Sequence, residues 1–378
     1  AVVVVVSAMA GETDRLIGLC KSIAPMPDPA EYDVVISSGE QVTSALTALA
    51  LQAEGAPAVS LQGHQVRILT DDEHAKAKIE DVETSALFEA LQAGKVVVVP
   101  GFQGITANGR VSTLGRGGSD LTAVALAAAL KASVCEIYTD VDGVYTTDPG
   151  IVDRARKIPR IAYEEMLEMA SLGAKVLQTR SVLFAMRYNV PVHVRSSFSD
   201  VEGTWVVGEE PDMEKNPVLG IAYNKNEGKI GLRHVPDRPG VAAKIFLALA
   251  KDGINVDMII QNVGHDGMTD MTFTAPKDEI AKAEAVMDRI CEEIGAERVE
   301  TDLGIVKISI IGAGMRTHSG IAAMMFEALA RVGINVQMIS TSEIKISCIV
   351  DAKFTELAVR ELHDTFGLAQ GQVRAESL

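Results

Sequence analysis

The chain reads Leu114-Gly115-Arg116-Gly117-Gly118-Ser119-Asp120 at its most informative point, and an alanine-rich helical pattern, Leu121–Leu130, follows directly. Glycines let backbone N–H groups approach a bound anion, and a helix N-terminus adds positive potential. Either Ser119 or Asp120 is the expected N-cap. Arg116 offers a planar fork that suits a carboxylate. No Gly-Lys-Ser/Thr follows, so this is not a P-loop; the alternative is a tight strand-to-helix turn with a solvated arginine.

Apolar runs and helical patterns alternate on both sides of this loop. The runs are continuous, which is typical of parallel strands buried on both faces, and the helical patterns between them predict a covered, mainly parallel sheet. The expected strands are Val2–Val6, Val34–Ser37, Ala58–Ser60, Val96–Val99, Glu136–Tyr138 and Val192–Val194, and the expected helices include Gln41–Ala53, Leu121–Leu130 and Tyr163–Ala170.

Several loops with small or polar residues follow these expected strands, where open α/β sheets place their ligands. They are Ser7–Thr13, Ser38–Glu40, Gly101–Gly104 and the acidic segment Tyr138–Pro149. Three aspartates in the acidic segment could serve Mg²⁺, ribose or adenine, although a solvated acidic turn has the same composition. Lys175 could neutralise a phosphate or be an ordinary surface lysine.

A polar stretch with two prolines, Gly208–Pro217, predicts a domain boundary. Beyond it, Gly240–Ile259 and Gly320–Ile339 are identical at thirteen of twenty positions, at an offset of 80 residues. Each copy reads as strand, helix, strand, strand and helix, which predicts a βαββαβ unit made twice. We therefore expect domains at 1–210, 219–303 and 304–378.

Composition excludes several classes of function. The formal net charge of −16 disfavours binding to nucleic acid or anionic lipid. Four scattered cysteines indicate free thiols in a reducing cytosol, and seven scattered histidines show no metal-ligand spacing. With no signal peptide and no apolar run that looks long enough to span a bilayer, we expect a cytoplasmic protein.

These residues resemble the aspartate kinase family along nearly the whole chain. The resemblance rests on Ser38–Val42, Gln65–Thr70, Gly115–Asp120, Tyr138–Pro149, Glu164–Ala170 and Ile339–Ile344. It implies an amino-acid-kinase three-layer αβα sandwich with a mainly parallel sheet, followed by two ACT domains of the ferredoxin-like βαββαβ type. One departure is the family's opening strand and loop, Lys-Phe-Gly-Gly-Thr-Ser. It does not occur here, so we expect that an N-terminal piece, with a strand and a helix, is missing.

The resemblance also implies roles for individual residues. Arg116, Lys175 and Asp140 would be catalytic, and Mg²⁺ would accompany ATP, with no metal site of the protein's own. The aspartate pocket would comprise Thr13, Glu40, Phe102, Arg116, Gly117, Gly118, Ser119 and Asp120, and the ATP site Ser7, Thr139, Asp140, Tyr145, Asp148, Lys175 and Val176. Effectors would contact Asp237, Asn255, Val256, Asp257 and Gln261 in the first repeat and Asn335, Val336, Ser342 and Glu343 in the second.

The implied activity is ATP-dependent phosphorylation of the L-aspartate side chain, the first step of lysine, threonine and methionine biosynthesis, inhibited by threonine or lysine in an oligomer joined through the ACT domains. Two alternatives remain at this point: a catalytically impaired, amino-acid-binding regulatory chain, and another small-molecule kinase of the same fold. Met213 could also start a separate regulatory subunit.

Overall fold

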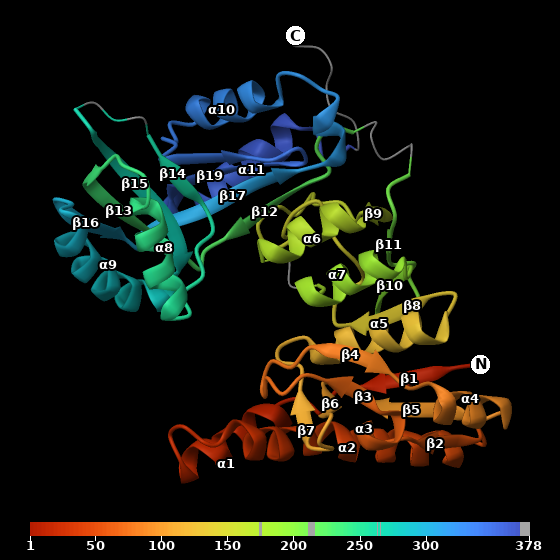
Figure 1. The fold of residues 1–378 in the computed structure, drawn as a ribbon. Coiled ribbons are helices and arrows are strands. Elements are labelled where there is room, and N and C mark those ends of the chain that lie inside the picture. Colours follow the sequence, from red (N-terminus) through yellow and green to blue (C-terminus); the bar gives the residue numbers. More distant parts are fainter. Residues whose placement is uncertain (174–175, 211–215, 263, 265, 371–378) are drawn as a thin grey trace. The chain divides into compact units, whose positions relative to one another are not determined.

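The computed structural model describes residues 1–173, 176–210, 216–262, 264 and 266–370. The chain divides into two compact units, one of residues 1–144 and 158–210 and one of residues 145–157 and 211–378 (Figure 1). Half of the predicted linker, 211–215 with Met213, lies outside the described residues. The domain limits expected from the sequence remain a prediction.

The first unit contains parallel strand pairs, as expected. In the sheet β1-β5-β2, Val3 of β1 and Ala58 of β2 lie opposite Val97 and Val96 of β5, both in parallel register. In the sheet β8-β10-β11-β9, the outer pairs are parallel and β10 and β11 antiparallel. A mixed sheet has the order β4-β3-β6-β7. The strands are β1 (Val3–Val6), β2 (Ala58–Ser60), β3 (Ile68–Thr70), β4 (Ile79–Val82), β5 (Val96–Pro100), β6 (Gln103–Thr106), β7 (Val111–Thr113), β8 (Cys135–Thr139), β9 (Arg160–Ala162), β10 (Val192–Ser196) and β11 (Thr204–Val207).

Helices pack on these sheets and complete the core of the first unit. Helix α5 contacts both β1 and β8, and its Leu126 joins a buried cluster with Val97, Val99 and Leu87. The helices are α1 (Glu12–Ile23), α2 (Pro29–Ala53), α3 (Gly63–Val66), α4 (Ser85–Gln92), α5 (Gly118–Leu130), α6 (Tyr163–Ser171) and α7 (Thr179–Tyr188).

One predicted strand is wrong: Val34–Ser37 is part of helix α2. The Asp28 side chain caps this helix by accepting hydrogen bonds from the backbone N–H groups of Ala30 and Glu31, both at 3.0 Å, and Pro29 occupies the first turn. A helix therefore starts before the apolar run, and a run of four residues cannot by itself distinguish strand from helix.

Helix α2 is also long and apolar enough to cross a membrane by length and composition alone, contrary to the sequence-based expectation. It nevertheless carries the buried carboxylates of Asp33 and Glu40, and both accept hydrogen bonds within the first unit. Because buried ionised groups need such partners, we interpret α2 as a core helix of this unit.

The first repeat of the second unit has the predicted βαββαβ order. Its antiparallel sheet, β14-β15-β13-β16, has the helices packed on it through Ile245, Leu249, Phe273 and Met287. The elements are β13 (Glu227–Pro236), α8 (Val241–Lys251), β14 (Ile259–Gln261), β15 (Met268–Pro276), α9 (Ile280–Ile294) and β16 (Arg298–Asp302).

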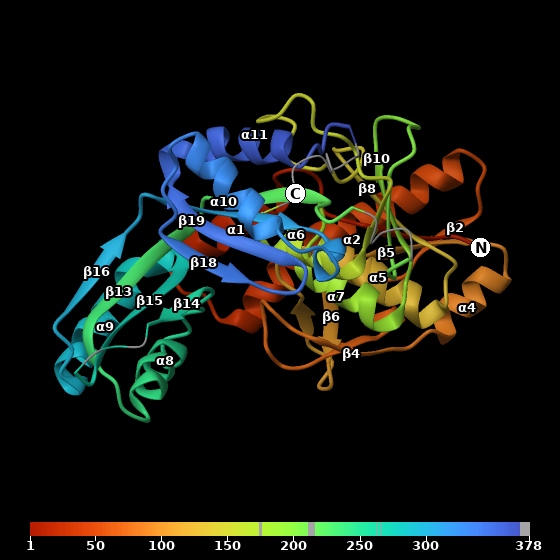
Figure 2. The same cartoon turned by 90° about the horizontal axis from the view of Figure 1, so that it is seen from above.

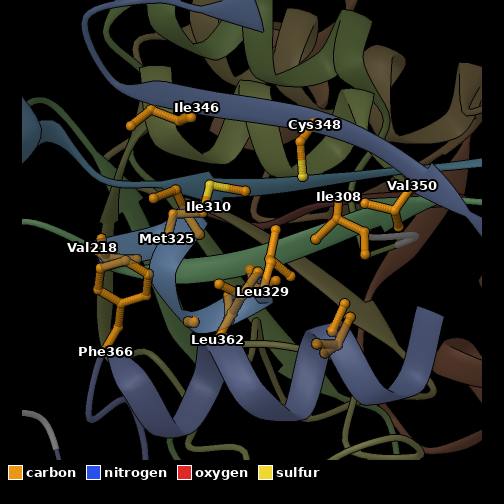
Figure 3. Close-up of a cluster of buried hydrophobic side chains, with 14 of the residues drawn as sticks. Val218, Ile308, Ile310, Met325, Leu329, Ile346, Cys348, Val350, Leu362 and Phe366 are labelled. Carbon is orange, nitrogen blue, oxygen red and sulfur yellow. The ribbon is translucent and has the colours of Figure 1, made fainter. Parts of the chain in front are cut away.

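The second repeat differs from the prediction in the origin of its last strand. Its sheet has the order β12-β17-β19-β18, so the outer position beside β17 is filled by β12, which precedes the first repeat in the sequence (Figures 1 and 2). Met325, Leu329, Cys348 and Phe366 belong to its buried core (Figure 3). The elements are β12 (Gly220–Asn224), β17 (Ile305–Ile311), α10 (Ile321–Arg331), β18 (Met338–Thr341), β19 (Lys345–Asp351) and α11 (Thr355–Thr365).

Residues 145–157 follow strand β8 of the first unit in sequence but belong to the second unit. Val152 lies in the core of the second repeat, and the Thr146 hydroxyl lies 3.0 Å from Nε2 of the buried His363. The Tyr223 hydroxyl donates to Asp148 at 2.7 Å. Residues 145–157 are therefore an integral part of the second unit, whereas Asp140, from the first part of the acidic segment, is exposed.

Candidate functional site

Four elements of the first unit converge where β1 and β5 end. The N–H of Gly101 donates to the carbonyl of Val6 at 2.9 Å, which ties the loop after β5 to the end of β1. A β-carbon on Gly101 would lie 2.7 Å from Oγ of Ser119, so this loop touches the first turn of α5. A β-carbon on Gly39 would lie 2.8 Å from Cβ of Ala8, so α2 touches the loop after β1. Glycine permits both close approaches.

Glu40 brings a buried carboxylate to this point from α2. Its side chain is 4% exposed, and Oε1 accepts a hydrogen bond from the backbone N–H of Ala8 at 3.1 Å. The other oxygen, Oε2, is buried without a hydrogen-bond partner in the described part of the chain. Burial raises the pKa of Glu40, and the Ala8 N–H opposes that shift. A buried acceptor without a partner is costly, so a cationic ligand group is its natural complement.

Arg116 is exposed and lies on the loop between β7 and α5. Gly115 and Gly117, its neighbours, have φ angles of 78° and 70°, in the left-handed region that favours glycine. Contrary to the prediction, Gly117 is the N-cap, and helix α5 begins at Gly118 without a side-chain cap. Ser119 and Asp120 lie inside the first turn. The N–H of Gly118 donates to the carbonyl of Gly115 at 3.0 Å, so the N–H groups of Ser119 and Asp120 are the ones that this uncapped helix start offers to an anion.

The remaining predicted pocket residues surround this helix start. Phe102 has a φ of 69°, which is strained for a bulky residue, and its N–H donates to Oγ1 of Thr122 on α5 at 3.2 Å. A β-carbon on Gly118 would lie 2.8 Å from Cδ2 of Phe102. Thr13 is half-buried at the start of α1. The structure thus brings together helix α2 with Glu40, the loop with Phe102, and the first turn of α5 with Gly118 and Ser119.

Asp120 is the one carboxyl group here with a large pKa shift. Burial raises its pKa to about 6, although it accepts a hydrogen bond from the backbone of Gln178. In the unfolded chain an aspartate titrates near 3.9. The folded state therefore binds the extra proton between these values, and its stability falls as the pH rises from about 4 to about 6.

We predict that Asp120→Asn stabilises the chain at pH 8 by at most about 3 kcal/mol and at pH 4.5 by about 1 kcal/mol or less, because only the ionised carboxylate incurs the cost of burial. Thermal unfolding at the two pH values measures this difference. Asp14→Asn is the matched control, since Asp14 is an exposed aspartate in the first turn of α1. An equal change at both pH values would contradict the assignment.

The predicted ATP residues fall into three groups. Ser7 after β1 and Thr139 and Asp140 at the end of β8 lie in the first unit, and the Thr139 hydroxyl donates to Asp140 at 3.1 Å. Tyr145 and Asp148 belong to the second unit, where Asp148 binds the Tyr223 hydroxyl. Val176 is half-buried in the first unit, and Lys175 lies outside the described residues.

The predicted effector residues do not form one group: some lie near the start of helix α8 or α10, and others follow the end of one of these helices. A cavity of about 560 Å³ lies at the N-terminus of α10 and is lined by Ser342, Glu343, Arg316 and His318 among others. Nε of Arg316 lies 3.6 Å from Oε2 of Glu343. Asn335 and Val336, by contrast, follow the C-terminal end of α10 and do not line this cavity.

The turns after α8 and α10 lie at the seam between the repeats. Asp257 forms an ion pair with Lys307 of the second repeat, and Gln337 accepts a hydrogen bond from Lys229 of the first. Asn255 and Val256 belong to the same turn as Asp257. Asp237, by contrast, directly follows β13, and Gln261 is the last residue of β14. The structure thus already gives the carboxylate of Asp257, one of the expected effector contacts, a cationic partner in Lys307.

Sequence reasoning missed residues that support the Arg116 loop from behind. Asp33 is fully buried on α2, and Arg180 on α7 donates to the carbonyls of Leu114 and Ala77. A β-carbon on Gly117 would fall 1.8 Å from Cγ of Gln178, so that side chain closes over the loop. Asp33 lies seven residues before Glu40, a helical spacing that would have linked them had α2 been recognised.

Comparison with known proteins gives consistent matches. Residues 1–196 match the amino acid kinase family, and residues 230–295 and 308–366 each match an ACT domain. A Pseudomonas putida protein named aspartate kinase is 56% identical over 367 residues, which cover 97% of this chain and 89% of that protein.

Two solved structures of Escherichia coli aspartokinase III also match. The complex with lysine and aspartate has a TM-score of 0.76 at 27% identity and covers 96% of this chain and 92% of that one. The complex with aspartate and ADP has a TM-score of 0.74 at 30% identity and covers 93% of this chain and 79% of that one.

Proposed function

This chain belongs to the aspartate kinases of the amino acid kinase family, and from that premise we propose that Arg116 and Glu40 bind the two charged ends of L-aspartate while ATP phosphorylates its side chain. The product is 4-phospho-L-aspartate, which starts the biosynthesis of lysine, threonine and methionine. The observation that carries the substrate assignment is Glu40, a buried carboxylate with one oxygen lacking a partner in the described part of the chain. That oxygen suits the α-ammonium group of an amino acid.

The α-carboxylate of aspartate would then bind the fork of Arg116 and the N–H groups of the first turn of α5. The side-chain carboxylate is already a nucleophile, so no general base is needed. One of its oxygens attacks the γ-phosphorus as the bond from that phosphorus to the ADP oxygen breaks. Catalysis by this chain consists of positioning the two anions and neutralising their charge. Lys175 is a further candidate for that neutralisation.

Mg²⁺ fits as a companion of ATP rather than as a resident metal. Magnesium in such sites takes one or two carboxylates together with substrate phosphates. Asp140 at the end of β8 is exposed, and the described residues contain no cluster of three or more metal-binding side chains. Asp140 would hold the ion, which supplies positive charge to the transferring phosphoryl group. Ser7, Thr139 and Val176 would contact the nucleotide, and Tyr145 and Asp148 remain proposed contacts from the second unit.

Trapping the acyl phosphate with hydroxylamine tests the activity directly. With Mg-ATP, we expect hydroxamate to form from L-aspartate and not from L-glutamate, whose longer side chain displaces the carboxylate from the γ-phosphorus. The D enantiomer of aspartate is the control for the Glu40 and Arg116 contacts. Hydroxamate from glutamate alone would overturn the substrate assignment.

The cavity at the start of α10 is the proposed effector site of the second repeat. An amino acid effector such as lysine or threonine carries both charges. Its carboxylate would bind Arg316 and the first N–H groups of α10, and its ammonium group would bind Glu343. Ser342 is within the same lining. The other proposed effector contacts do not line this cavity; they are Asp237, Asn255, Val256, Asp257, Gln261, Asn335 and Val336.

We predict that Glu343→Gln weakens inhibition by lysine or threonine at least about five-fold, the lower end of typical allosteric coupling, while uninhibited turnover stays the same. Inhibition curves at fixed substrate measure it. Asp257→Asn separates the two candidate sites, since it changes the seam and leaves the cavity intact. If only Asp257→Asn relieves inhibition, the effector binds at the seam instead.

Self-association through the ACT repeats is the proposed oligomeric arrangement. Strands β14 and β18 lie at the edges of their sheets, and they carry exposed isoleucines at equivalent repeat positions, Ile259 and Ile339. Exposed edge strands with apolar side chains are common pairing surfaces. A cytoplasmic location is likewise proposed from the family.

A further inference from the structure

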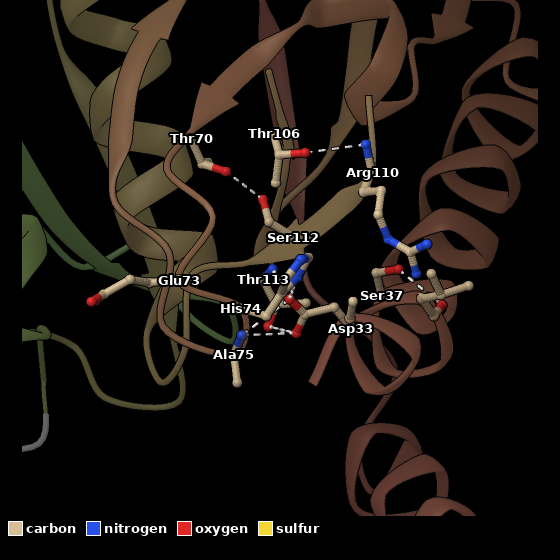
Figure 4. Close-up of polar contacts among 12 residues, drawn as sticks. Asp33, Ser37, Thr70, Glu73, His74, Ala75, Thr106, Arg110, Ser112 and Thr113 are labelled. Carbon is tan, nitrogen blue, oxygen red and sulfur yellow. Dashed lines mark hydrogen bonds and ion pairs between the residues drawn. The ribbon is translucent and has the colours of Figure 1, made fainter. Parts of the chain in front are cut away.

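Asp33 is a fully buried carboxylate that accepts hydrogen bonds from two neighbouring segments, the end of strand β7 and the loop before β4. Oδ2 lies 2.8 Å from Nδ1 of His74, and both oxygens accept from the N–H of Ala75, at 3.0 and 3.1 Å. The Thr113 N–H donates to Oδ2 at 3.0 Å, and the Thr113 hydroxyl donates to Oδ1 at 2.6 Å (Figure 4). Asp33 is 0% exposed.

Burying a carboxylate costs free energy, so the hydrogen-bond donors around Asp33 must be held in fixed positions. An isolated carboxylate is costly to desolvate, and these hydrogen bonds compensate for that cost. The bonds join α2 to β7 and to the loop before β4. The N–H of Ala77 also donates to the carbonyl of Thr113 at 2.9 Å, so the two loop segments are tied to each other as well.

The segment held by Asp33 leads directly into the Arg116 loop. Thr113 ends β7, and Leu114, Gly115 and Arg116 follow. A β-carbon on Gly115 would lie 3.1 Å from the carbonyl oxygen of Ala75, so the loop rests on the residue that Asp33 holds. On the other side, the guanidinium of Arg180 donates to the carbonyls of Leu114 and Ala77. Asp33 and Arg180 thus fix the backbone immediately before Arg116.

The same helix also carries Glu40, seven residues or about two turns after Asp33. One rigid element therefore places the proposed receptor for the substrate ammonium and anchors the loop that bears the proposed receptor for the substrate carboxylate. The spacing between the two receptors must match the short backbone of one amino acid. Displacement of one receptor by about 1 Å can cost on the order of a hundred-fold in rate.

We propose that Asp33 is a positioning residue for substrate selection: through Thr113 and Ala75 it fixes the Arg116 loop relative to Glu40, and so sets the distance over which an amino acid is recognised. This inference rests on the proposed function, because it requires Arg116 to bind the substrate carboxylate. Asp33 itself touches no substrate.

The experiment compares Asp33→Asn with Arg116→Lys and with the double variant in the full chain. Calorimetry gives the dissociation constants for aspartate and for Mg-ATP, and thermal unfolding gives stability. The expected result for Asp33→Asn is aspartate binding weakened about ten-fold or more, with ATP binding within about two-fold. In the double variant, Asp33→Asn should weaken aspartate binding little beyond Arg116→Lys alone, because both act through one contact.

Glu31→Gln is the matched control. Oε1 of Glu31 accepts from Nη2 of Arg110 at 2.8 Å, so this exposed ion pair also joins α2 to the β6–β7 hairpin. It should leave aspartate affinity unchanged. If Asp33→Asn does not fold, Thr113→Val decides, since it removes only the hydroxyl donor to Asp33. It should weaken aspartate binding in the same direction by a smaller factor, and an unchanged affinity would overturn the proposal.

The outcomes distinguish the role proposed for Arg116 from the positioning role proposed for Asp33. If Arg116→Lys leaves aspartate binding unchanged, the role proposed for Arg116 is wrong, and the positioning role falls with it. If Arg116→Lys weakens binding but Asp33→Asn weakens aspartate and ATP equally, or lowers stability alone, only the positioning role is overturned, and Asp33 is a structural residue.

Discussion

Arg116→Lys is expected to weaken aspartate binding about 10- to 100-fold, since a hydrogen bond to a charged group is worth about 1.5–3 kcal/mol. An ammonium group can meet one carboxylate oxygen but cannot reproduce the planar fork of a guanidinium. Arg116 is exposed, and the described residues provide no hydrogen bond or ion pair to its side chain. We therefore expect folding to be unaffected and the loss to be confined to the substrate.

Steady-state kinetics checks this result through the Michaelis constants of the two substrates. The KM for aspartate should rise while that for ATP changes less than about three-fold. Arg110→Lys is the control, because Arg110 is another exposed arginine of the same unit and lies on the β6–β7 turn. Equal effects on aspartate and ATP would instead identify Arg116 as a structural loop residue.

The ACT repeats could be predicted from the sequence because their pattern is local and occurs twice. Strands β13 and β17 each precede the first helix of their repeat, α8 and α10, in the order that the repeated sequence predicts. The second repeat was harder to predict, because its outer strand β12 comes from before the first repeat. Strand exchange of this kind leaves no periodic signal, since pairing across a sheet is a long-range contact.

In the first unit, too, local features could be predicted from the sequence and long-range contacts could not. Glycines and a single arginine before an apolar helix indicated an anion-binding helix start, and α5 does begin there. The support for that loop was not predictable. Asp33 lies 80 residues from Thr113 in the sequence. The run Val34–Ser37 that follows Asp33 suggests a strand, because four apolar or small residues fit the period of a strand as well as that of a helix. Only the capping residues Asp28 and Pro29 distinguish the helix.

Lys307→Met should destabilise the second unit by about 3–5 kcal/mol, the usual cost of removing one partner from a buried ion pair. Lys307 on β17 is 5% exposed, and Nζ lies 3.0 Å from Oε1 of Glu227, which is also 5% exposed. It forms a second ion pair with Asp257. Burial by itself would lower the pKa of Lys307, but Glu227 and Asp257 outweigh burial, so the pKa is raised and the group stays charged.

The internal repeat provides a matched control for this prediction. Lys229 is the corresponding lysine of the first repeat, and it contacts Gln337 and, at 3.5 Å, Asp302. Its side chain is 25% exposed and its seam partner is neutral. Lys229→Met should therefore cost much less in a denaturant titration that follows the second unit. Equal costs for the two variants would contradict the assignment of the Lys307 pair as a buried one.

The Lys307 pair also bears on how the two repeats came to differ in function. Asp257 and Gln337 occupy the same repeat position, but only Asp257 can neutralise a buried lysine across the seam. An effector ammonium group at Asp257 would have to compete with Lys307, whereas the carboxylate of Glu343 at the cavity is exposed and lies 3.6 Å from Nε of Arg316. If Lys307→Met destabilises the unit and leaves inhibition by lysine or threonine intact, the seam holds the repeats together and is not the effector site, and Glu343→Gln then tests the cavity.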